Sequence, residues 1–386
     1  MTQVWPKVPL KAIARVVGGS TPKSAVSEFW DGDIAWATPK DLSDLDGKYI
    51  SDTPRKITEV GLRSCSSELL PANSVLLSSR APIGHVAINR IPMATNQGFK
   101  SLVPNEKVAP SYLYWWLRSH RSELERLGNG ATFKEISKAV VERVEILLPP
   151  LEEQKRIAAI LDQADDIRRK RQHAIDRLNQ LGQAIFYEMF GDPENNDRNW
   201  PVVKVGEYSD CIVPGRDKPK TFTGDIPWIT TGEIIHLGTT QKDQAKAYLS
   251  QEEISAVRAR VIPGSSVIMT CVGDLGKVSI AGSPMVINQQ LHSYQCSNQL
   301  DPYFLMFMLS HRQGWMFKMA TKTTLPYMNK SICNSVPIFM PPMELQKQFG
   351  TRWQSLTRSI EPMEAALSQI DALFISLQHR AFRGEL

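Results

Sequence analysis

The chain has 386 residues, of which 42% are apolar and 22% charged, and its formal net charge is +5 at pH 7. It is long enough to bury more than one core and favours two to three domains, and its small basic excess is compatible with a polyanion partner but also common in proteins without one. No apolar run approaches the roughly 20 residues that cross a bilayer, and the scattered cysteines never have CxxC spacing, so we expect a soluble, cytoplasmic protein without a zinc site or disulfide framework.

Residues 1 to 150 predict a mixed α/β unit. Short apolar runs at 75–78 and 85–88 are bounded by Asn, Pro and Gly residues, as strands are. Residues 111 to 124 place Leu113, Trp116, Leu117 and Leu124 at the spacing of an amphipathic helix. Because strand-like and helical patterns alternate within one stretch, this unit is expected to fold as one mixed domain.

A long helix is predicted to begin after Pro149 and Pro150 and to end near Gly191. On a heptad that starts at Ile157, most a and d positions are apolar, so a packed left-handed helix pair is expected. The residues expected to form the contact from this helix are Ile157, Ile160, Ile167, Leu178, Leu181 and Ile185.

The run that opens this helix occurs twice. Pro149 and Gln154 recur as Pro341 and Gln346, at an offset of 192 residues (341 − 149). The same offset relates further pairs of identical residues, including Trp36 and Trp228, Gly84 and Gly276, Asn96 and Asn288, and Thr132 and Thr324. A register kept over most of the chain indicates a duplicated unit. The two repeated tryptophans are best interpreted as core anchors.

The second mixed unit covers about residues 200 to 342 and is followed by a second long helix. Its pairing stripe is predicted at Phe349, Leu356, Met363, Ile370 and Leu377. Pro362 lacks a backbone N–H and is expected to kink or restart this helix. We expect the two helices, each about 55 Å long, to pair antiparallel in a pseudo-two-fold molecule. Such a molecule would hold two readers a fixed distance apart along a duplex.

Three segments resemble those of a known family. They are the Leu-Pro-Pro-Leu-Glu-Glu-Gln-Lys-Arg-Ile-Ala run at 148–158, the Glu-Met-Phe-Gly-Asp-Pro helix end at 188–193, and the terminal Ala-Phe-Arg-Gly-Glu-Leu at 381–386. With these motifs the whole chain resembles the DNA-specificity subunit of type I restriction-modification systems. The resemblance implies an α/β fold in which two similar mixed α/β target-recognition domains are separated by two long helices that pack as an antiparallel coiled coil.

The resemblance also implies an organisation and a set of partners. It implies target-recognition domain 1 at 1–150, a central conserved helical region at 151–192, target-recognition domain 2 at 193–342 and a distal conserved helical region at 343–386. The expected partners are double-stranded DNA with a split, asymmetric target, two methyltransferase subunits that bring S-adenosylmethionine, and two restriction subunits that use ATP and Mg. The assembled complex would methylate adenine and cleave foreign DNA, whereas this chain is expected to be non-catalytic and to hold no cofactor.

The sequence lacks the short motifs of catalytic alternatives. It contains no Asn-Pro-Pro-Tyr or Asp-Pro-Pro-Tyr element, no GxGxxG, no GxxxxGK[ST] and no HExxH. The best nuclease-like group is Asp41 with Asp46 and Lys48, but the second acid and the lysine are missing from the second copy. We therefore interpret this group as a solvated turn and predict no metal site.

Two loops at equivalent places are candidates for DNA contact. Their polar residues are Ser20, Thr21 and Lys23 in the first unit and Arg216, Lys218 and Lys220 in the second. Such loops can present donors to phosphates, which supply affinity without sequence information, and a plain surface turn is an equal alternative. The dipeptides Asn96-Gln97 and Asn288-Gln289 could pair with adenine, because Asn and Gln can both bind it bidentately in the major groove. Because they are identical in both units, a structural hydrogen-bond role is favoured for them.

Further candidates lie near predicted strand ends or in the loop before the last strand. They are Arg80, Lys100, Thr132 and Lys134 in the first unit, and Lys277, His292, Lys322, Thr324, Tyr327 and Lys330 in the second. Because the two half-sites would differ, residues that differ between the units are the better candidates for base contact. The basic run at 168–171 is surrounded by aspartates on the same helix and is expected to form an ion-paired face.

Two other classes of function remain open, a stand-alone DNA-modifying enzyme and a protein-interaction rod with two binding modules. The missing catalytic motifs argue against the enzyme. Binding to DNA that weakens steeply with salt would favour a DNA reader over the rod, because neutralised phosphates release counterions.

Overall fold

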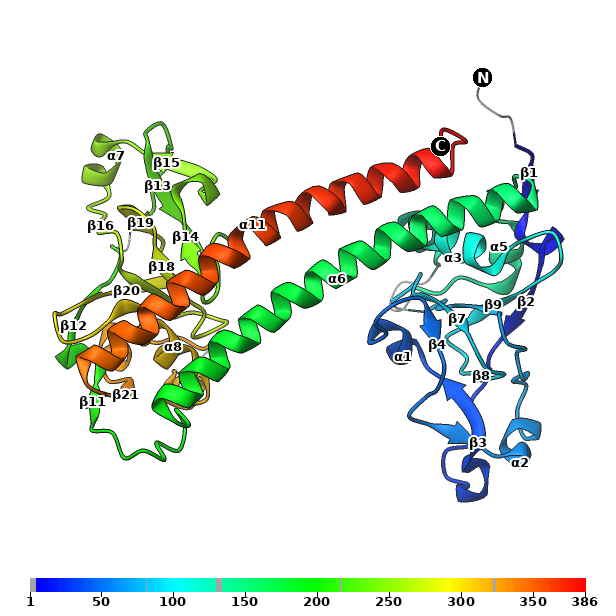
Figure 1. Ribbon diagram of the computed structural model, residues 1–386, viewed down its shortest axis with the longest axis horizontal. Coiled ribbons are helices and arrows are strands. Elements are labelled where there is room, and N and C mark those ends of the chain that lie inside the picture. The colour runs from blue at the N-terminus through cyan, green and yellow to red at the C-terminus, as the bar shows by residue number, and fades with distance from the viewer. Residues whose placement is uncertain (1–4, 81, 130–133, 216, 322–323) are drawn as a thin grey trace. The chain divides into compact units, whose positions relative to one another are not determined.

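The computed structural model describes residues 5–80, 82–129, 134–215, 217–321 and 324–386. The chain divides into two compact units, unit 1 being Met1–Arg171 with Leu367–Leu386, and unit 2 being Gln172–Ala366. Each unit contains one mixed α/β domain and a part of each of two long helices, α6 (Leu151–Phe190) and α11 (Met343–Ala381) (Figure 1).

The domain of unit 1 is built mainly from short strands. Its elements in chain order are β1 Lys7–Pro9, η1 Leu10–Ala12, β2 Ala14–Gly18, η2 Ser27–Phe29, β3 Trp30–Ala37, α1 Pro39–Ser43, β4 Tyr49–Ile50, β5 Lys56–Ile57, α2 Glu59–Arg63, β6 Val75–Leu77, β7 Val86–Asn89, β8 Ala94–Thr95, β9 Lys100–Pro104, α3 Pro110–Ser119, α4 Arg121–Leu127, α5 Lys138–Arg143 and β10 Glu145–Leu147. The strands form a two-stranded sheet β1-β10, a five-stranded sheet β2-β9-β6-β7-β4 and a three-stranded sheet β5-β3-β8.

The domain of unit 2 has a corresponding set of elements. In chain order they are β11 Val202–Lys204, η3 Val205–Glu207, β12 Ser209–Ile212, β13 Ile226–Ile229, β14 Thr239–Thr240, η4 Lys242–Gln244, β15 Ala247–Leu249, α7 Gln251–Ala256, β16 Val261–Ile262, β17 Val267–Thr270, β18 Val278–Ala281, β19 Met285–Ile287, β20 Leu291–Cys296, α8 Pro302–Ser310, α9 Gln313–Met319, α10 Lys330–Asn334 and β21 Pro337–Phe339. The strands form a two-stranded sheet β11-β21, a five-stranded sheet β12-β20-β17-β18-β14 and a four-stranded sheet β15-β13-β19-β16.

The two domains share one topology. The order β12-β20-β17-β18-β14 repeats β2-β9-β6-β7-β4, and the parallel pairs β13–β19 and β14–β18 repeat β3–β8 and β4–β7. The counterpart of β16 in unit 1 is the bridge between Leu70 and Met93. The predicted core anchors Trp36 and Trp228 are buried, with 2% and 8% of their surface exposed. The predicted duplication of a mixed α/β fold is thus confirmed.

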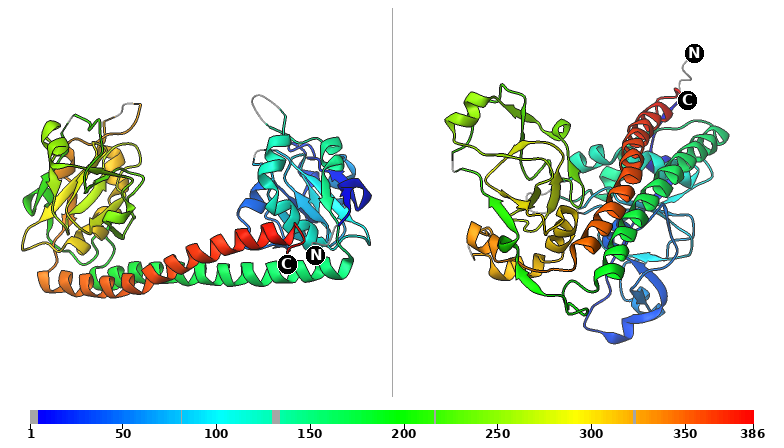
Figure 2. Two further views of the ribbon diagram at one scale, coloured as in Figure 1. Left: turned by 90° about the horizontal axis from the view of Figure 1, so that it is seen from above. Right: turned by 60° about the vertical axis from the view of Figure 1, so that its left-hand side comes forward.

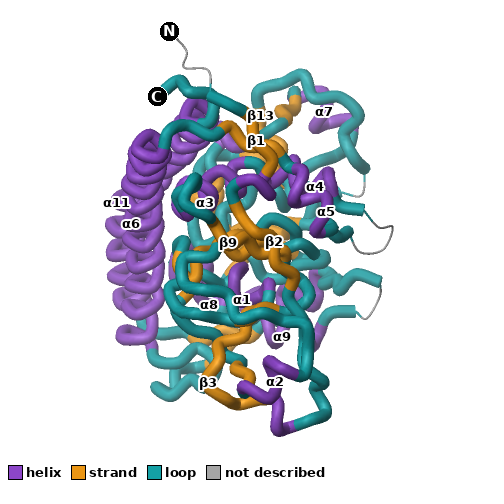
Figure 3. The backbone as a smooth tube through the Cα atoms, turned by 90° about the vertical axis from the view of Figure 1, so that its right-hand side faces the viewer, coloured by secondary structure: helices purple, strands orange, loops and turns teal. Residues whose placement is uncertain are grey.

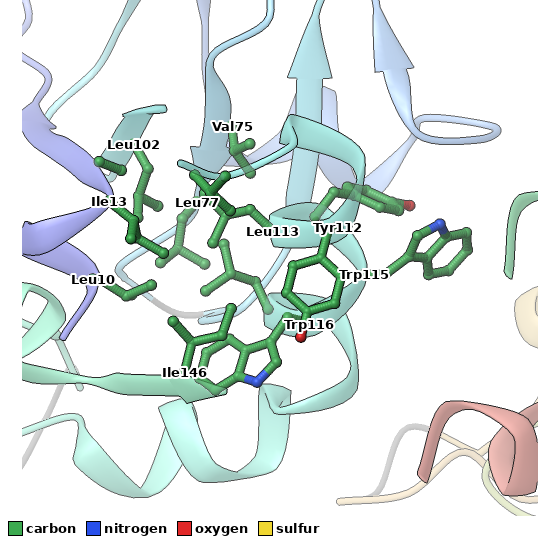
Figure 4. Close-up of a cluster of buried hydrophobic side chains, with 14 of the residues drawn as sticks. Leu10, Ile13, Val75, Leu77, Leu102, Tyr112, Leu113, Trp115, Trp116 and Ile146 are labelled. Atoms are coloured by element: carbon green, nitrogen blue, oxygen red, sulfur yellow. The ribbon is translucent and has the colours of Figure 1, made fainter. Parts of the chain in front are cut away.

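The five-stranded sheet of unit 1 is covered on both faces. Val75 and Leu77 of β6 pack with α3, which buries every side chain from Tyr112 to Leu117 (Figure 4). Leu76, between them, packs into a different cluster with Phe99. Because successive side chains of a strand point to opposite faces, a strand covered on both sides must be apolar throughout. That requirement explains the uninterrupted Val-Leu-Leu sequence of β6.

The repeated Pro-Pro-x-Glu-x-Gln run begins both long helices, and its glutamine anchors each helix to the domain. Gln154 is fully buried, and its Nε2 donates to the carbonyls of Lys107 and Pro149 at 3.0 and 2.9 Å. Gln346, also fully buried, donates to the carbonyls of Gln299 and Pro341 at 3.4 and 2.9 Å. The motif therefore fixes the start of a helix rather than forming a surface site.

The ends and interior of the long helices follow from single residues. α6 ends at Phe190 because Gly191 has a φ of 81°, the left-handed conformation in which helices commonly terminate. α11 continues without interruption through Pro362, so the helix does not restart there, and the alternative of a kink stays a prediction. Ile360 and Leu367, on either side of the proline, are both buried, and the proline itself removes only one backbone hydrogen bond donor.

Within each unit, segments of the two long helices run antiparallel along one side of the domain (Figure 2). In unit 1, Arg156 donates to the Leu386 carbonyl at 3.2 Å, whereas Arg168, further along α6, donates to Asp371 at 3.4 Å, earlier on α11. In unit 2 the Phe186 and Phe349 rings meet with centroids 5.2 Å apart. The predicted antiparallel pairing is confirmed in both units.

In unit 2 the pairing also depends on a glycine. An added Cβ at Gly182 would overlap the Trp353 ring, so only glycine fits at this point of α6. The ring that fills the space belongs to α11, and it also meets Phe307 of α8 with centroids 4.5 Å apart. The close approach of helix backbone to indole therefore fixes α11 to both α6 and the domain.

The structure corrects two positions of the α6 face that was predicted to pair. Ile157 and Phe349 are buried, and the partly buried predicted residues are Ile160, Leu178, Ile185, Leu356, Met363, Ile370 and Leu377. Ile167 and Leu181, however, are 50% and 47% exposed, so their predicted pairing role is wrong. The inward positions beside them are Leu161, Asp165, Ile175 and Gly182. The apolar pattern of the sequence favoured the neighbouring stripe of α6, because two of the inward positions are occupied by an ion-paired aspartate and a glycine.

Candidate nucleic-acid interface

Three segments of unit 1 meet at one edge of its domain. Ser79, just after β6, accepts a backbone hydrogen bond from Ile136 at 2.9 Å and donates one to Gly98 at 2.7 Å. Asn129 and Glu135 form a backbone bridge that closes the segment between α4 and α5. α4 and α5 lie on the side of this domain away from α6 (Figure 3). The edge is therefore composed of a strand end, a turn and the bridged residues Asn129 and Glu135.

Charged side chains from these segments converge on Glu135. Arg80 donates its Nε–H to one carboxylate oxygen at 2.7 Å, and Lys100 donates to the other at 3.1 Å. Although burial favours the protonated form, the hydrogen bonds from Arg80 and Lys100 lower the pKa of Glu135 below its usual value. The group is thus an anion between two cations, and its three side chains together carry one net positive charge.

A fourth segment of unit 1, the predicted loop with Ser20 and Thr21, is attached to the same edge. The indole N–H of Trp36 donates to the Ser20 carbonyl at 3.1 Å, and the Thr21 hydroxyl donates to Gln97. Asn96 closes the turn next to it by accepting the Gly98 N–H at 2.9 Å. The two residues of the Asn-Gln pair therefore have different roles, since the asparagine shapes the turn and the glutamine holds the loop.

Unit 2 builds the same frame. Cys271 donates to the Gln290 carbonyl at 2.9 Å and accepts from Met328 at 2.9 Å, and Tyr327 forms a backbone bridge with Thr321. Each of these contacts is the counterpart, 192 residues on, of one in unit 1. The repeated backbone contacts show that the frame belongs to the duplicated fold.

The Asn-Gln pair has the same roles in unit 2. Asn288 closes its turn by accepting the Gln290 N–H at 3.1 Å. Gln289 holds the loop by donating to the carbonyls of Gly215 and Asp217, both at 3.1 Å. Asn288 is only 9% exposed. The structural role favoured for Asn96 and Asn288 thus accounts for both residues.

The side chains on the two frames differ in chemistry. Where unit 1 has Arg80 and Glu135, unit 2 has Val272 and Tyr327, each pair joined by the same backbone bridge. Tyr327 is 39% exposed and its neighbour Leu325 57% exposed. At these two frame positions unit 1 carries charged side chains and unit 2 an apolar and an aromatic one, so the two frames offer different contacts to a ligand.

One predicted contact residue is contradicted. His292, the counterpart of Lys100, is 1% exposed, and its ring Nδ1 lies 3.0 Å from the Cys333 sulfur. Burial, helped by the nearby Lys330, lowers the pKa of His292 to about 4. The predicted DNA contact is wrong because β20 turns this side chain into the core rather than toward solvent.

The remaining predicted residues lie at the surface or outside the described part of the chain. The exposed ones are Lys23, Lys134, Lys218, Lys220, Lys277, Thr324 and Lys330. Lys277 forms an ion pair with Asp274 at 2.9 Å. Thr132, Arg216 and Lys322 lie outside the described residues. The predictions for the exposed residues stay predictions.

The nuclease-like group has structural roles. Asp41 caps α1 by accepting the Thr38 N–H at 2.7 Å, and Glu233 accepts the Thr230 N–H at 2.9 Å in the same way. Lys48 forms an ion pair with Asp162 of α6. Among the residues that the structure describes, no group of three or more His, Cys, Asp and Glu side chains could hold a metal ion, and no helix could span a membrane.

Three residues of the basic run of α6, Arg168, Arg169 and Lys170, are ion-paired, as predicted. In unit 1, Arg168 and Arg169 both pair with Asp165 at 3.1 Å, and Lys170 pairs with Asp166 at 2.8 Å. Asp165 is buried, with 4% of its surface exposed. These cations therefore hold α6 locally and compensate a buried charge.

One feature escaped the sequence reasoning, and a second was predicted only in part. Glu135 was missed because its counterpart is a tyrosine, so a search for repeated residues passes over it. A structural hydrogen-bond role was expected for Gln97 and Gln289, since the Asn-Gln pair is identical in both units at the same offset. Their distant partners, at residues 21 and 215, could not be inferred from that signal.

Comparison of sequences identifies similar proteins along the whole chain. The family model described as "Type I restriction modification DNA specificity domain" matches residues 3–179 and 198–372. The MjaIX specificity subunit of Methanocaldococcus jannaschii is 27% identical, over 99% of this chain and 93% of its own length. The EcoR124I/EcoR124II specificity subunit of Escherichia coli is 30% identical over 47% of this chain and 46% of its own length.

Solved structures share the fold. The S subunit of a type I restriction-modification system from M. genitalium has a TM-score of 0.61 at 14% identity, covering 98% of this chain and 96% of its own. A chain from a structural study of complex assembly in the type I R-M system has a TM-score of 0.51 at 19% identity, covering 99% and 98%. At these identities the likeness is one of fold alone.

Proposed function

The chain belongs to the type I restriction-modification DNA specificity family, and we propose that it binds duplex DNA at an asymmetric two-part target, one half of which is read by each unit. The observation that carries the proposal is one frame bearing two sets of side chains. Arg80 and Glu135 in unit 1 stand where Val272 and Tyr327 stand in unit 2. Two different half-sites require a common scaffold of this kind with different contact residues.

The shared and the differing parts of the frame suit different DNA contacts. Phosphates have similar geometry at every sequence, so contacts with them fit the features that both units keep, such as the loops held by Gln97 and Gln289. Base edges differ between half-sites, so contacts with them fit the residues that differ. This division supports a reader of sequence over a general binder of DNA.

We further propose that the chain acts as a scaffold and supplies no catalytic group itself. Two methyltransferase subunits would bring S-adenosylmethionine and modify adenine, and two restriction subunits would bring ATP and Mg for cleavage. The complex would act in the cytoplasm against foreign DNA. Support comes from family membership and from the likeness in fold to a chain of an assembled type I system.

Mapping of methylated adenines tests the proposal directly. The chain is co-expressed with partner methyltransferase subunits, and genomic DNA is sequenced by a single-molecule method that detects methylation. We expect one motif with two specified parts and a gap of fixed length. A single contiguous motif, or methylation without sequence preference, would refute the two-part target.

Exchange of one unit tests the assignment of half-sites. Residues 1–150 are replaced by the corresponding segment of a relative that has a different target. We expect one half of the methylated motif to change and the other half to stay. If both halves change, or neither does, the one-unit, one-half model fails.

A salt titration separates DNA reading from the alternative of a protein-interaction rod. The assembled complex is titrated with duplex DNA at several salt concentrations. A DNA reader that contacts several phosphates gives a steep negative slope of log affinity against log salt concentration. A flat response, or no binding, would favour the rod.

A further inference from the structure

We infer that Arg80, positioned by Glu135, reads a guanine in the half-site of unit 1. The inference rests on the proposed function, since it assigns one base contact within that DNA interface. Guanine offers two acceptors, N7 and O6, in the major groove, and an arginine guanidinium can donate to both at once. Arg80 is at the edge where strand end, turn and loop converge.

The guanidinium of Arg80 is both held and accessible. Its Nε–H donates to Glu135 at 2.7 Å, and 47% of the side chain is exposed. Among the residues that the structure describes, its two Nη groups have no acceptor, and together they form the end-on fork of the guanidinium. An arginine anchored through Nε keeps both terminal nitrogens for a ligand, with less rotamer freedom left to lose on binding.

Glu135 is suited to positioning Arg80 because it is itself fixed. Lys100 donates to its other oxygen at 3.1 Å, and Lys100, only 14% exposed, also contacts the Ser79 hydroxyl at 3.4 Å. Hydrogen bonds from the two cations outweigh burial and keep the carboxylate ionised at neutral pH. Glu135 therefore acts through Arg80 and is a positioning residue.

The contrast with unit 2 distinguishes a base contact from a phosphate contact. The same backbone bridge there joins Val272 to Tyr327, and neither can make a bidentate donor pair. If Arg80 bound a phosphate, a cation would be expected at position 272 as well, because phosphates recur at both half-sites. A side chain that changes while its frame is kept is the pattern of a residue that selects a base.

The experiment measures discrimination at each base pair of the mapped target. The assembled methyltransferase complex, with wild-type chain or a variant, competes for duplexes that carry each single base-pair change. For Arg80→Ala and Arg80→Lys we expect discrimination at one G·C pair, in the unit 1 half only, to fall about 10- to 100-fold. Lysine keeps the charge but not the bidentate geometry, so it remains informative if the alanine variant is unstable.

Glu135 has its own variants. Glu135→Ala is expected to reduce discrimination at the same base pair as Arg80→Ala does. Glu135→Asp, which keeps the charge, is expected to retain part of that discrimination. A purely structural role would instead change binding at all positions of the half-site. The matched control is Arg63→Ala, which removes an arginine that is 80% exposed and ion-paired with Glu59 at 3.6 Å. It should leave discrimination within about twofold of wild type.

Other outcomes would overturn the inference. A uniform loss of affinity for every sequence would assign Arg80 to a phosphate, and unchanged discrimination would remove it from the interface. The absence of any G·C pair in the unit 1 half-site would also refute it. If the wild-type complex shows no sequence preference at all, the proposed function itself fails, and this result is distinguishable because it needs no variant.

Discussion

The side-chain oxygen of Gln154, on the first turn of α6, accepts the backbone N–H of Ala109 at 2.8 Å. Ala109 immediately precedes α3, so this bond joins the start of a long helix to the start of the main core helix of the domain. Gln346 accepts the N–H of Asp301, before α8, at 2.9 Å in unit 2. The repeated Pro-Pro-x-Glu-x-Gln motif thus joins the N-termini of two helices through the hydrogen bonds of its glutamine.

Gln154→Ala should destabilise unit 1. The substitution leaves the Ala109 N–H and two carbonyls without a partner in a buried place, and we expect the free energy of unfolding to fall by about 2–4 kcal/mol. Hydrogen exchange of unit 1 amides gives a local measurement that does not require two-state unfolding of the whole chain. Gln163→Ala, at an exposed glutamine of the same helix within unit 1, is the control. Equal effects of both substitutions would contradict the proposed joint.

Phe374→Ala should weaken the attachment of α11 to unit 1. Phe374 is 8% exposed, and its ring centroid lies 5.6 Å from that of Trp115 on α3. Loss of a buried phenyl ring is expected to lower the free energy of unfolding by about 3–4 kcal/mol. Leu373→Ala, at a position that is 69% exposed, serves as the control and should cost under about 0.5 kcal/mol. A reversed order would show that the other face of α11 is attached.

The corrected register of α6 predicts a further difference in stability. Leu161 is fully buried, whereas Ile167 is 50% exposed. Leu161→Ala is expected to cost about 2–4 kcal/mol and Ile167→Ala under about 1 kcal/mol. Both substitutions remove an aliphatic side chain from the same helix in unit 1, so helix propensity is similar in the two. If chemical denaturation shows a larger loss of unfolding free energy for Ile167→Ala than for Leu161→Ala, the heptad predicted from the sequence is supported instead.

The duplicated architecture was predictable because the residues that repeat in the sequence form hydrogen bonds with the nearby backbone in both units. Gln154 and Gln346, or Asn96 and Asn288, serve the same turn or helix start in both copies, so they keep one offset. The order of strands in the sheets was not predictable, since β2 pairs with β9 across more than eighty residues of chain. Local patterns carry no information about such pairings.

The contact residues were only partly predictable, because exposure depends on distant neighbours. Lys100 and His292 occupy the same register, yet one reaches Glu135 and the other lies against Cys333. The residue of unit 1 that is equivalent to Cys333 is Val141, which offers no polar partner. A side chain predicted from the sequence to contact DNA can thus point into the core instead, when a residue far along the chain provides a buried partner for it.

The burial of His292 makes the stability of unit 2 depend on pH. The pKa of His292 is about 4 in the folded chain, whereas an unfolded histidine titrates near 6.5. Between these values the unfolded state binds more protons than the folded state, so the free energy of unfolding falls as pH falls from about 6.5 to about 4. The full difference corresponds to roughly 3 kcal/mol, and above pH 6.5 the contribution is complete.

His292→Gln tests this dependence, because glutamine does not titrate. The free energy of unfolding of unit 2 is measured at pH 7 and at pH 4.5 by hydrogen exchange or denaturant. We expect the loss of stability on acidification to be smaller in the variant by roughly 2–3 kcal/mol. His379→Gln, at an exposed position of α11, should leave the loss unchanged. Since the ring faces the core, the variant should also keep the methylated target, and an altered target would return His292 to the DNA interface.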